Sequence, residues 1–283
     1  MANTLDLVTK FAPYVDEMFS TESKLSLLTN TDFDWTGAHT VKVYKITTSA
    51  MNDYDRGGEN GGYSRFGTIA GLDATTEEMT LKKDRSFTFA LDKLDTDETA
   101  QQLAAASALA RQEREVIVPE VDSYVYQVMC KNAGHQPAPL SLTSDNIYAQ
   151  ILKASQALDD AQAPEAGRVL VASPAVYALM KQNAQIVMET DIGADLRQKG
   201  VLGLLDGATV VKVPSIRLPS AFGVLLAHPV ATAAPVKLED YRIQQDPPGI
   251  SGALVEGRIC YDAFVLENKK DALYYQAVGT TGS

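Results

Sequence analysis

The hydrophobic pattern changes along the chain, and its first part predicts extended structure. β-Branched residues crowd the segment 41–48, VKVYKITT, and predict a strand. The segment 79–91 alternates apolar and polar positions, with Phe87 and Phe89 on the apolar side. This alternation predicts a single strand of roughly 44 Å, which is longer than usual, so we expect the strand to leave the body of the protein.

Glycines dominate the segment between these two predicted strands. Six of them lie between Gly57 and Gly71, where they mark turns and local flexibility. The stretch GGENGG resembles a phosphate-binding loop, but no strand leads directly into it and no Lys-Ser or Lys-Thr pair closes it. A two-stranded extension with such a tip buries too little apolar surface by itself, so we expect it to dock on a neighbouring molecule.

Helical spacing of apolar residues appears in two places. Residues 5–19 form an amphipathic pattern on an acidic segment, which predicts a short element that lies on another surface. The segment 97–134 predicts a spine helix on the order of 55 Å long, with Thr96 as its N-cap. Because Pro119 interrupts this pattern and Gly134 ends it, we expect one long kinked helix or two abutting helices.

A second body of alternating helices and strands is predicted from residue 145 onward. Its expected elements are a helix over 147–158, a strand over 168–172, a helix that Ser173-Pro174 begins, a turn at Asp206-Gly207 before a strand, and a buried strand over 221–229. Residues 252–278 alternate, turn at 268–271, and predict a hairpin-like pair of strands that returns to the first body.

Composition narrows the functional classes. The 283 residues allow one elaborated domain or two modest ones, and 45% hydrophobic with 22% charged residues is ordinary for a globular protein. The net charge of 25 − 36 = −11 argues against a sequence-reading nucleic-acid binder. Cys130 and Cys260 are expected to be reduced thiols, and we expect no signal peptide and no membrane span, which fits a cytosolic origin.

No recognisable catalytic chemistry stands out in the sequence. His39, His135 and His228 are isolated from one another and from cysteine, so no metal site is predicted. Ser251 lacks the G-x-S-x-G pattern, and Cys130 has no activating neighbour that the sequence reveals. We therefore predict no catalytic, metal-binding or cofactor-binding residues, and we expect that the protein is not an enzyme.

Basic residues concentrate at two positions. Lys82, Lys83 and Arg85 form a dense basic cluster on the long predicted strand, and Arg111 and Arg114 lie in a mixed-charge band on the spine. Ordinary solubilising charge is the simpler interpretation, because exposed ion pairs contribute at most about 1 kcal/mol each. The more specific hypothesis is that these five residues contact a neighbouring subunit and select its orientation.

The order of these elements resembles that of tailed-bacteriophage major capsid proteins of the Hong Kong 97 type. The resemblance rests on the packing patterns EREVIVPEVDSYVYQVM (113–129), RVLVASPAVYALMKQ (168–182), GVLGLLDGATVVKVPSIRLP (200–219) and GALVEGRICYDAFVLENKKDALYY (252–275). It implies an α+β fold with four parts: an N-terminal arm (1–40), an extended hairpin loop (41–95), a peripheral domain with the spine helix (96–144 and 251–283), and an α/β axial domain (145–250).

The resemblance also implies a function. Proteins of this family form pentamers and hexamers that build an icosahedral shell around double-stranded DNA, so we expect a virion location and assembly in the host cytoplasm. The acidic charge suits a shell that must not bind DNA tightly. The short arm leads us to expect a separate scaffolding protein, with a portal and possible decoration proteins as further partners, and no membrane.

Three alternatives remain open at the level of sequence. Some family members cross-link subunits through a Lys–Asn bond promoted by a Glu; Lys82 or Lys83, Asn268 and Glu267 have suitable types, but no motif fixes them and we do not predict the bond. An encapsulin-like nanocompartment shares the fold. A cytosolic α/β enzyme with its active site near 168–183 represents a different class.

Overall fold

The computed structural model describes residues 22–30, 32–33, 40–46, 48–58, 64–69, 71–93, 105–183, 185–186 and 203–279. The chain divides into two compact units, one formed by Trp35–Leu81 and the other by Met1–Asp34 together with Lys82–Ser283. The amphipathic element expected over 5–19 lies outside the described residues. The four-part domain division remains a prediction.

The smaller unit is an antiparallel hairpin. Strand β1 (Thr40–Ile46) pairs with β2 (Ala74–Thr80) along their whole lengths, as expected for a two-stranded extension. An ion pair joins Lys42 to Glu78 directly across the strands, and another joins Lys45 Nζ to Glu77 Oε2 at 3.3 Å. Cross-strand charge pairs of this kind help to fix the register of this hairpin, to which no third described strand is added.

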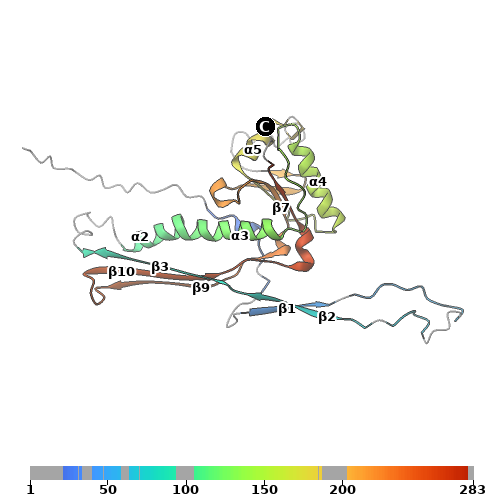
Figure 1. Ribbon diagram of the computed structural model, residues 1–283, viewed down its shortest axis with the longest axis horizontal. Coiled ribbons are helices and arrows are strands. Elements are labelled where there is room, and N and C mark those ends of the chain that lie inside the picture. Colours follow the sequence, from blue (N-terminus) through green and yellow to red (C-terminus); the bar gives the residue numbers. More distant parts are fainter. Residues whose placement is uncertain are drawn as a thin grey trace, which may run out of the picture. The chain divides into compact units, whose positions relative to one another are not determined.

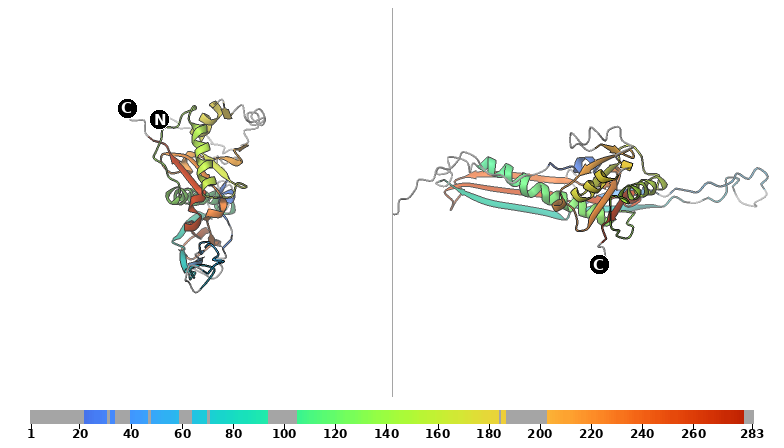
Figure 2. Two further views of the ribbon diagram at one scale, coloured as in Figure 1. Left: turned by 90° about the vertical axis from the view of Figure 1, so that its right-hand side faces the viewer. Right: turned by 90° about the horizontal axis from the view of Figure 1, so that it is seen from above.

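A three-stranded antiparallel sheet runs beside the spine helix in the larger unit (Figures 1 and 2). Its order is β3 (Lys83–Asp92), β10 (Gly252–Tyr261) and β9 (Val236–Gln245). The single strand expected over 79–91 is therefore wrong, because β2 ends at Thr80 and β3 belongs to a different sheet. The backbone N–H of Lys82 donates to Asp262 Oδ2 at 2.8 Å, which interrupts the strand ladder at this point.

The spine helix is continuous from Ala105 to Asn132. It consists of α2 (Ala105–Gln112), a π-helical turn (Glu113–Ile117) and α3 (Val118–Asn132). Pro119 has no N–H to donate, and the wider π turn just before it accommodates this missing bond, so the helix does not break into two. The predicted cap Thr96 lies outside the described residues. Beyond the helix, a Cβ on Gly134 would lie 2.8 Å from the Asp271 backbone, so glycine is needed for close approach.

A five-stranded sheet forms the centre of the larger unit. Its order is β12 (Leu273–Ala277), β7 (Phe222–Ala227), β4 (Val169–Ala172), β6 (Ala208–Lys212) and β5 (Leu204–Leu205). Side chains on one face, including Val171 and Leu225, pack with α3 residues such as Val125. Those on the other face, including Leu170 and Leu226, pack with α4 (Ile147–Asp160) and α5 (Pro174–Gln182). Successive side chains of β4 and β7 point to opposite faces and every one of them is buried, so both faces of the sheet are covered.

Local signals predicted several of these elements correctly. Ser173 Oγ accepts a hydrogen bond from the Val176 N–H at 3.3 Å and caps α5, as expected. Asp206 and Gly207 adopt φ values of 50° and 73°, which is the turn expected before β6. The hairpin-like pair expected over 252–278 is wrong, because β10 belongs to the three-stranded sheet whereas β12 pairs with β7.

Short elements complete the larger unit. They are the 3₁₀ turns η1 (Leu25–Leu27), η3 (Ser215–Arg217), η4 (Pro229–Ala231) and η5 (Glu267–Ala272) and the two-stranded pair β8 (Thr232–Ala233) and β11 (Phe264–Val265). Within the described part of the chain, no helix is both long enough and apolar enough to cross a membrane.

Candidate functional site

The hairpin unit exposes many large apolar side chains. Met51 is 97% exposed and Ile69 is 83% exposed. The other large apolar side chains exposed in this unit are Tyr44, Ile46, Tyr54, Phe66 and Leu72. Such a concentration is unusual for the surface of a monomer and marks an interaction surface. Sequence reasoning predicted that this segment docks but did not single out these residues, although apolar side chains inside a glycine-rich stretch were a visible signal.

The tip of the hairpin is organised by its own contacts. The rings of Tyr54 and Phe66 meet edge to face with centroids 5.1 Å apart. The Asp55 backbone N–H donates to the Arg65 carbonyl at 2.9 Å, and Asp55 Oδ1 accepts from the Gly58 N–H at 2.7 Å. The tip therefore presents a paired aromatic surface, and aromatic side chains are frequent anchors of protein interfaces.

The five predicted contact residues fall into two groups in the structure. Lys83 Nζ lies 4.8 Å from the centroid of the Tyr124 ring, and Arg85 Nε pairs with Glu120 Oε1 at 2.8 Å, so both side chains reach α3 of their own chain. Lys82 binds Asp262 through its backbone. Contact of these residues with a neighbouring subunit remains a prediction.

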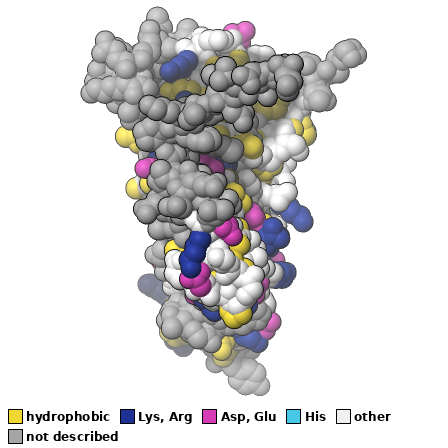
Figure 3. Space-filling view, turned by 90° about the vertical axis from the view of Figure 1, so that its left-hand side faces the viewer, with side chains coloured by type: hydrophobic (Ala, Val, Ile, Leu, Met, Phe, Trp, Pro, Cys, Tyr) yellow, Lys and Arg dark blue, Asp and Glu magenta, His cyan; other side chains and the backbone are white. Residues whose placement is uncertain are grey.

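The second group belongs to the spine helix. Arg111 is half-buried in α2, and Arg114 is exposed on the π-helical turn. Figure 3 views the end of the molecule near α2, and its described surface shows basic and acidic side chains interspersed. A mixed surface of this kind favours selection of a partner over attraction of nucleic acid.

Tyrosines and carboxylates join α3 to β10 and to the loop after β10. Tyr124 Oη donates to Asp262 Oδ1 at 2.7 Å, and Tyr261 Oη donates to Glu120 Oε1 at 3.1 Å. Burial raises the pKa of Tyr261 to about 12, with Glu120 adding to the effect, and burial and Asp262 raise the pKa of Tyr124. Both phenols stay protonated at neutral pH, so they act as structural donors.

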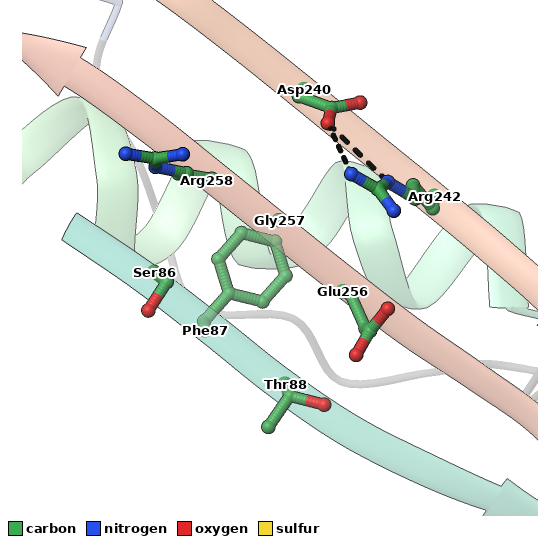
Figure 4. A pocket seen from close by; sticks show the side chains of 8 residues that line it. All are labelled: Ser86, Phe87, Thr88, Asp240, Arg242, Glu256, Gly257 and Arg258. Atoms are coloured by element: carbon green, nitrogen blue, oxygen red, sulfur yellow. Dashed lines mark hydrogen bonds and ion pairs between the residues drawn. The ribbon is translucent and has the colours of Figure 1, made fainter. Parts of the chain in front are cut away.

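A polar groove of about 470 Å³ lies on the three-stranded sheet (Figure 4). Arg258 binds both oxygens of Asp84, with Nε–Oδ1 at 2.9 Å, and Arg242 Nη2 binds Asp240 Oδ2 at 2.8 Å. The hydrogen bond from Arg258 lowers the pKa of Asp84, and Glu256 accepts a weak hydrogen bond from Gln244. Asp240 of the lining is paired with Arg242, and Arg258 of the lining is paired with Asp84. The groove therefore suits contact with another polar surface better than acid–base catalysis.

A buried ion pair links the spine helix to η3. Arg217 Nη1 lies 2.7 Å from Asp122 Oδ2, and both side chains are less than 5% exposed. Ser23 Oγ donates to the other carboxylate oxygen at 2.6 Å, and Leu28, three residues past the start of η1, is fully buried in the same core. No local sequence signal pairs residues 95 positions apart, so this contact could not be predicted.

The residues considered for catalysis have structural roles. Burial raises the pKa of the Cys130 thiol to about 12, which opposes its use as a nucleophile. Buried Arg168 binds Asp159 and two backbone carbonyls, and Asn183 binds the Ser144 carbonyl at 2.6 Å. Among the described residues, no group of three or more His, Cys, Asp or Glu side chains is placed to hold a metal ion.

Comparisons with known proteins add evidence on the fold. No protein-family model matches the sequence, and no curated protein is similar enough to count as a match. A chain from a Mycobacterium phage Che8 structure matches with a TM-score of 0.80 and 17% identity, covering 100% of both chains. The capsid structure of the cyanophage P-SCSP1u matches with a TM-score of 0.76 and 14% identity, covering 98% of this chain and 94% of that one.

A third match comes from a different kind of particle. The virus-like particle from Pyrococcus furiosus matches with a TM-score of 0.55 and 15% identity, covering 90% of this chain and 92% of that one. The expected α+β fold is thus confirmed over nearly the whole chain, and the chain has the Hong Kong 97 type capsid fold.

Proposed function

We propose that this chain is a major capsid protein that assembles as pentamers and hexamers into an icosahedral shell around phage double-stranded DNA. The proposal is supported by the fold shared with the cyanophage capsid over almost the full length of both chains. It assigns the protein a structural role, without catalysis, in the virion, and assembly in the host cytoplasm.

The observation that carries the proposal is the exposed apolar surface of the hairpin unit. An isolated two-stranded hairpin is marginally stable in water, and this one leaves Tyr44, Ile46 and Phe66 more than half exposed. A shell supplies many copies of one chain, so a second copy is the partner that this surface would meet most often. Repetition of a modest contact around a closed shell then gives strong overall association.

The enclosed DNA and the accessory proteins follow from the same proposal. A net charge of −11 opposes tight binding of DNA to the shell wall, so DNA is enclosed without recognition of its sequence. A separate scaffolding protein, a portal and possible decoration proteins are the further partners.

Electron microscopy of the purified protein tests this function. We expect closed icosahedral particles, and particles from infected cells should protect DNA from added nuclease. A Phe66→Ser/Ile69→Ser variant should stay folded but form few particles, whereas a matched Thr75→Ser variant on β2 should assemble normally. A protein that remains monomeric under all assembly conditions would contradict the proposal.

An encapsulin-like nanocompartment is the second candidate, and the match to the Pyrococcus furiosus particle favours keeping it. The microscopy experiment separates the two, because a nanocompartment would enclose protein and no nuclease-protected DNA. The third candidate, a cytosolic α/β enzyme, has less support because Arg168 and Asn183 are engaged in structural hydrogen bonds.

A further inference from the structure

The three-stranded sheet ends in two edge strands, β3 and β9. β10 lies between β3 and β9, and no described strand pairs with the outer side of β9. An edge strand of this length presents a row of backbone N–H and C=O groups that can pair with another chain. Natural proteins usually protect such an edge, so an open one is a candidate interface.

The charges on β9 have an order that would complement a second copy of the same strand. Asp240 and Arg242 lie two positions apart on one face of β9, and Figure 4 shows them side by side. Arg242 Nη2 and Nε lie 2.8 and 3.3 Å from Asp240 Oδ2, and the two side chains are 61% and 42% exposed. Tyr241 lies between them on the opposite face, with its ring 6.1 Å from that of Phe87.

We propose that β9 pairs with β9 of a second copy, in antiparallel register about a twofold axis that passes through Tyr241. Residues directly opposite in an antiparallel pair point to the same face. This register therefore sets Asp240 of each copy opposite Arg242 of the other, and the ion pair now made within one strand becomes two pairs between copies. The inference rests on the proposed function, in which copies of the chain meet in a shell.

Neighbouring registers are unfavourable. Shifting the pairing so that the twofold axis moves by one residue, to Asp240 or to Arg242, keeps the same faces of the two strands together. Either shift sets that residue directly opposite the same residue of the other copy, so two like charges meet. The other edge of the sheet lacks this complementarity, because Lys83 and Arg85, which lie two positions apart on β3, carry the same charge. The charge order thus selects β9 and a single register.

Mixed cysteine cross-linking tests the register. One preparation carries Asp240→Cys and the other carries Arg242→Cys, both with Cys260→Ser, while buried Cys130 is kept. Opposite residues lie about 4.5–5.5 Å apart between Cα atoms, within the range that a disulfide spans. Co-assembly of the two preparations followed by mild oxidation should give a disulfide-linked dimer on a non-reducing gel.

Each preparation alone is the matched control for cross-linking. In the proposed register the same residue of two copies is offset by two positions, about 7–8 Å, which is too far for efficient disulfide formation. We expect at least about tenfold less dimer than in the mixture. No dimer in the mixture, or equal dimer in each preparation alone, would overturn the register.

Charge reversal gives an independent measurement. Asp240→Arg alone and Arg242→Asp alone each set like charges opposite each other twice, so each should lower the yield of particles about tenfold or more. Mixing the two variants restores both ion pairs and should restore the yield. Thermal unfolding of each variant checks that the subunit is still folded.

The outcomes separate this inference from the proposed function. If the unmodified protein forms no particles, the proposed function fails. If the unmodified protein and both reversed variants form particles equally well, the pairing of β9 is overturned and the proposed function stands. Failure of both variants without rescue on mixing would show that β9 binds a different partner, which also overturns the pairing.

Discussion

The five-stranded sheet and the β1–β2 hairpin contain similar apolar residues but cover them very differently. Every residue of β7 is buried, and helices of the same chain pack on both faces of its sheet. The hairpin leaves Tyr44 and Ile46 more than half exposed on one face. The order of the sheet is therefore a property of the single chain, whereas the apolar surface of the hairpin is left for a partner to cover.

The buried ion pair of the larger unit should show the largest effect on stability. Replacing Arg217 by Met leaves the Asp122 carboxylate buried beside Ser23 without its cation. We expect the Arg217→Met variant to lose about 3–5 kcal/mol of unfolding free energy, measured by urea denaturation of the unassembled subunit. The double variant Asp122→Leu/Arg217→Met removes both charges and should recover most of this loss. A double variant as unstable as the single one would show that packing, not charge, dominates here.

Truncation of one apolar side chain in each region tests the comparison directly. Leu225 is fully buried, so Leu225→Ala should cost about 2–5 kcal/mol of unfolding free energy. Phe66 is 77% exposed, so Phe66→Ala should change the stability of the subunit by less than about 0.5 kcal/mol while reducing particle formation. Equal destabilisation by both changes would mean that the hairpin is stabilised within its own chain.

A close contact in the three-stranded sheet should have an intermediate effect. A Cβ on Gly257 would overlap the Phe87 ring and lie 2.8 Å from Tyr241 Cδ1. Gly257→Ala should therefore cost about 1–3 kcal/mol, measured by thermal unfolding. Combining it with Phe87→Leu should cost less than the sum of the two single changes, because the smaller side chain relieves the overlap. If the two free-energy costs simply add, the Phe87 ring moves aside freely and does not oppose a side chain at position 257.

The smallest effect concerns pH. Arg258 lowers the folded-state pKa of Asp84, so the Asp84–Arg258 pair stabilises the fold above the ordinary aspartate pKa. This contribution should disappear as pH falls through the lowered value, where the carboxylate becomes protonated in the folded state too. Melting temperatures of the protein and of Asp84→Asn should therefore differ at pH 7 and converge in strong acid. If the difference in melting temperature persists at low pH, packing and not the ion pair is its cause.

Sequence alone predicts the elements whose signals are local. The Ser173-Pro174 cap, the Asp206-Gly207 turn and the apolar strand at 169–172 each depend on neighbours in the sequence, and each is confirmed. The break between β2 and β3 depends on Asp262, which lies 180 positions from Lys82, so the alternating pattern across the break was misleading.

The candidate interfaces likewise combine features that local sequence predicts with features that depend on distant residues. The prediction that the hairpin docks on a neighbour followed from its glycines and its length, but which apolar residues remain exposed depends on tertiary packing. The partner of β12 is likewise set by packing, because β7 and β10 both have strand patterns to which it could pair.

The joining of β3 to β10 has a consequence for how the subunit folds. Four of the five strands of the central sheet lie between these two strands in the sequence, so their pairing requires closure of a very long loop and should occur late. Until then the hairpin of β9 and β10 has an empty side into which β3 of another molecule fits as well as its own. Slow, dilute refolding should therefore favour correct monomers, and rapid refolding at high concentration should favour strand-exchanged ones.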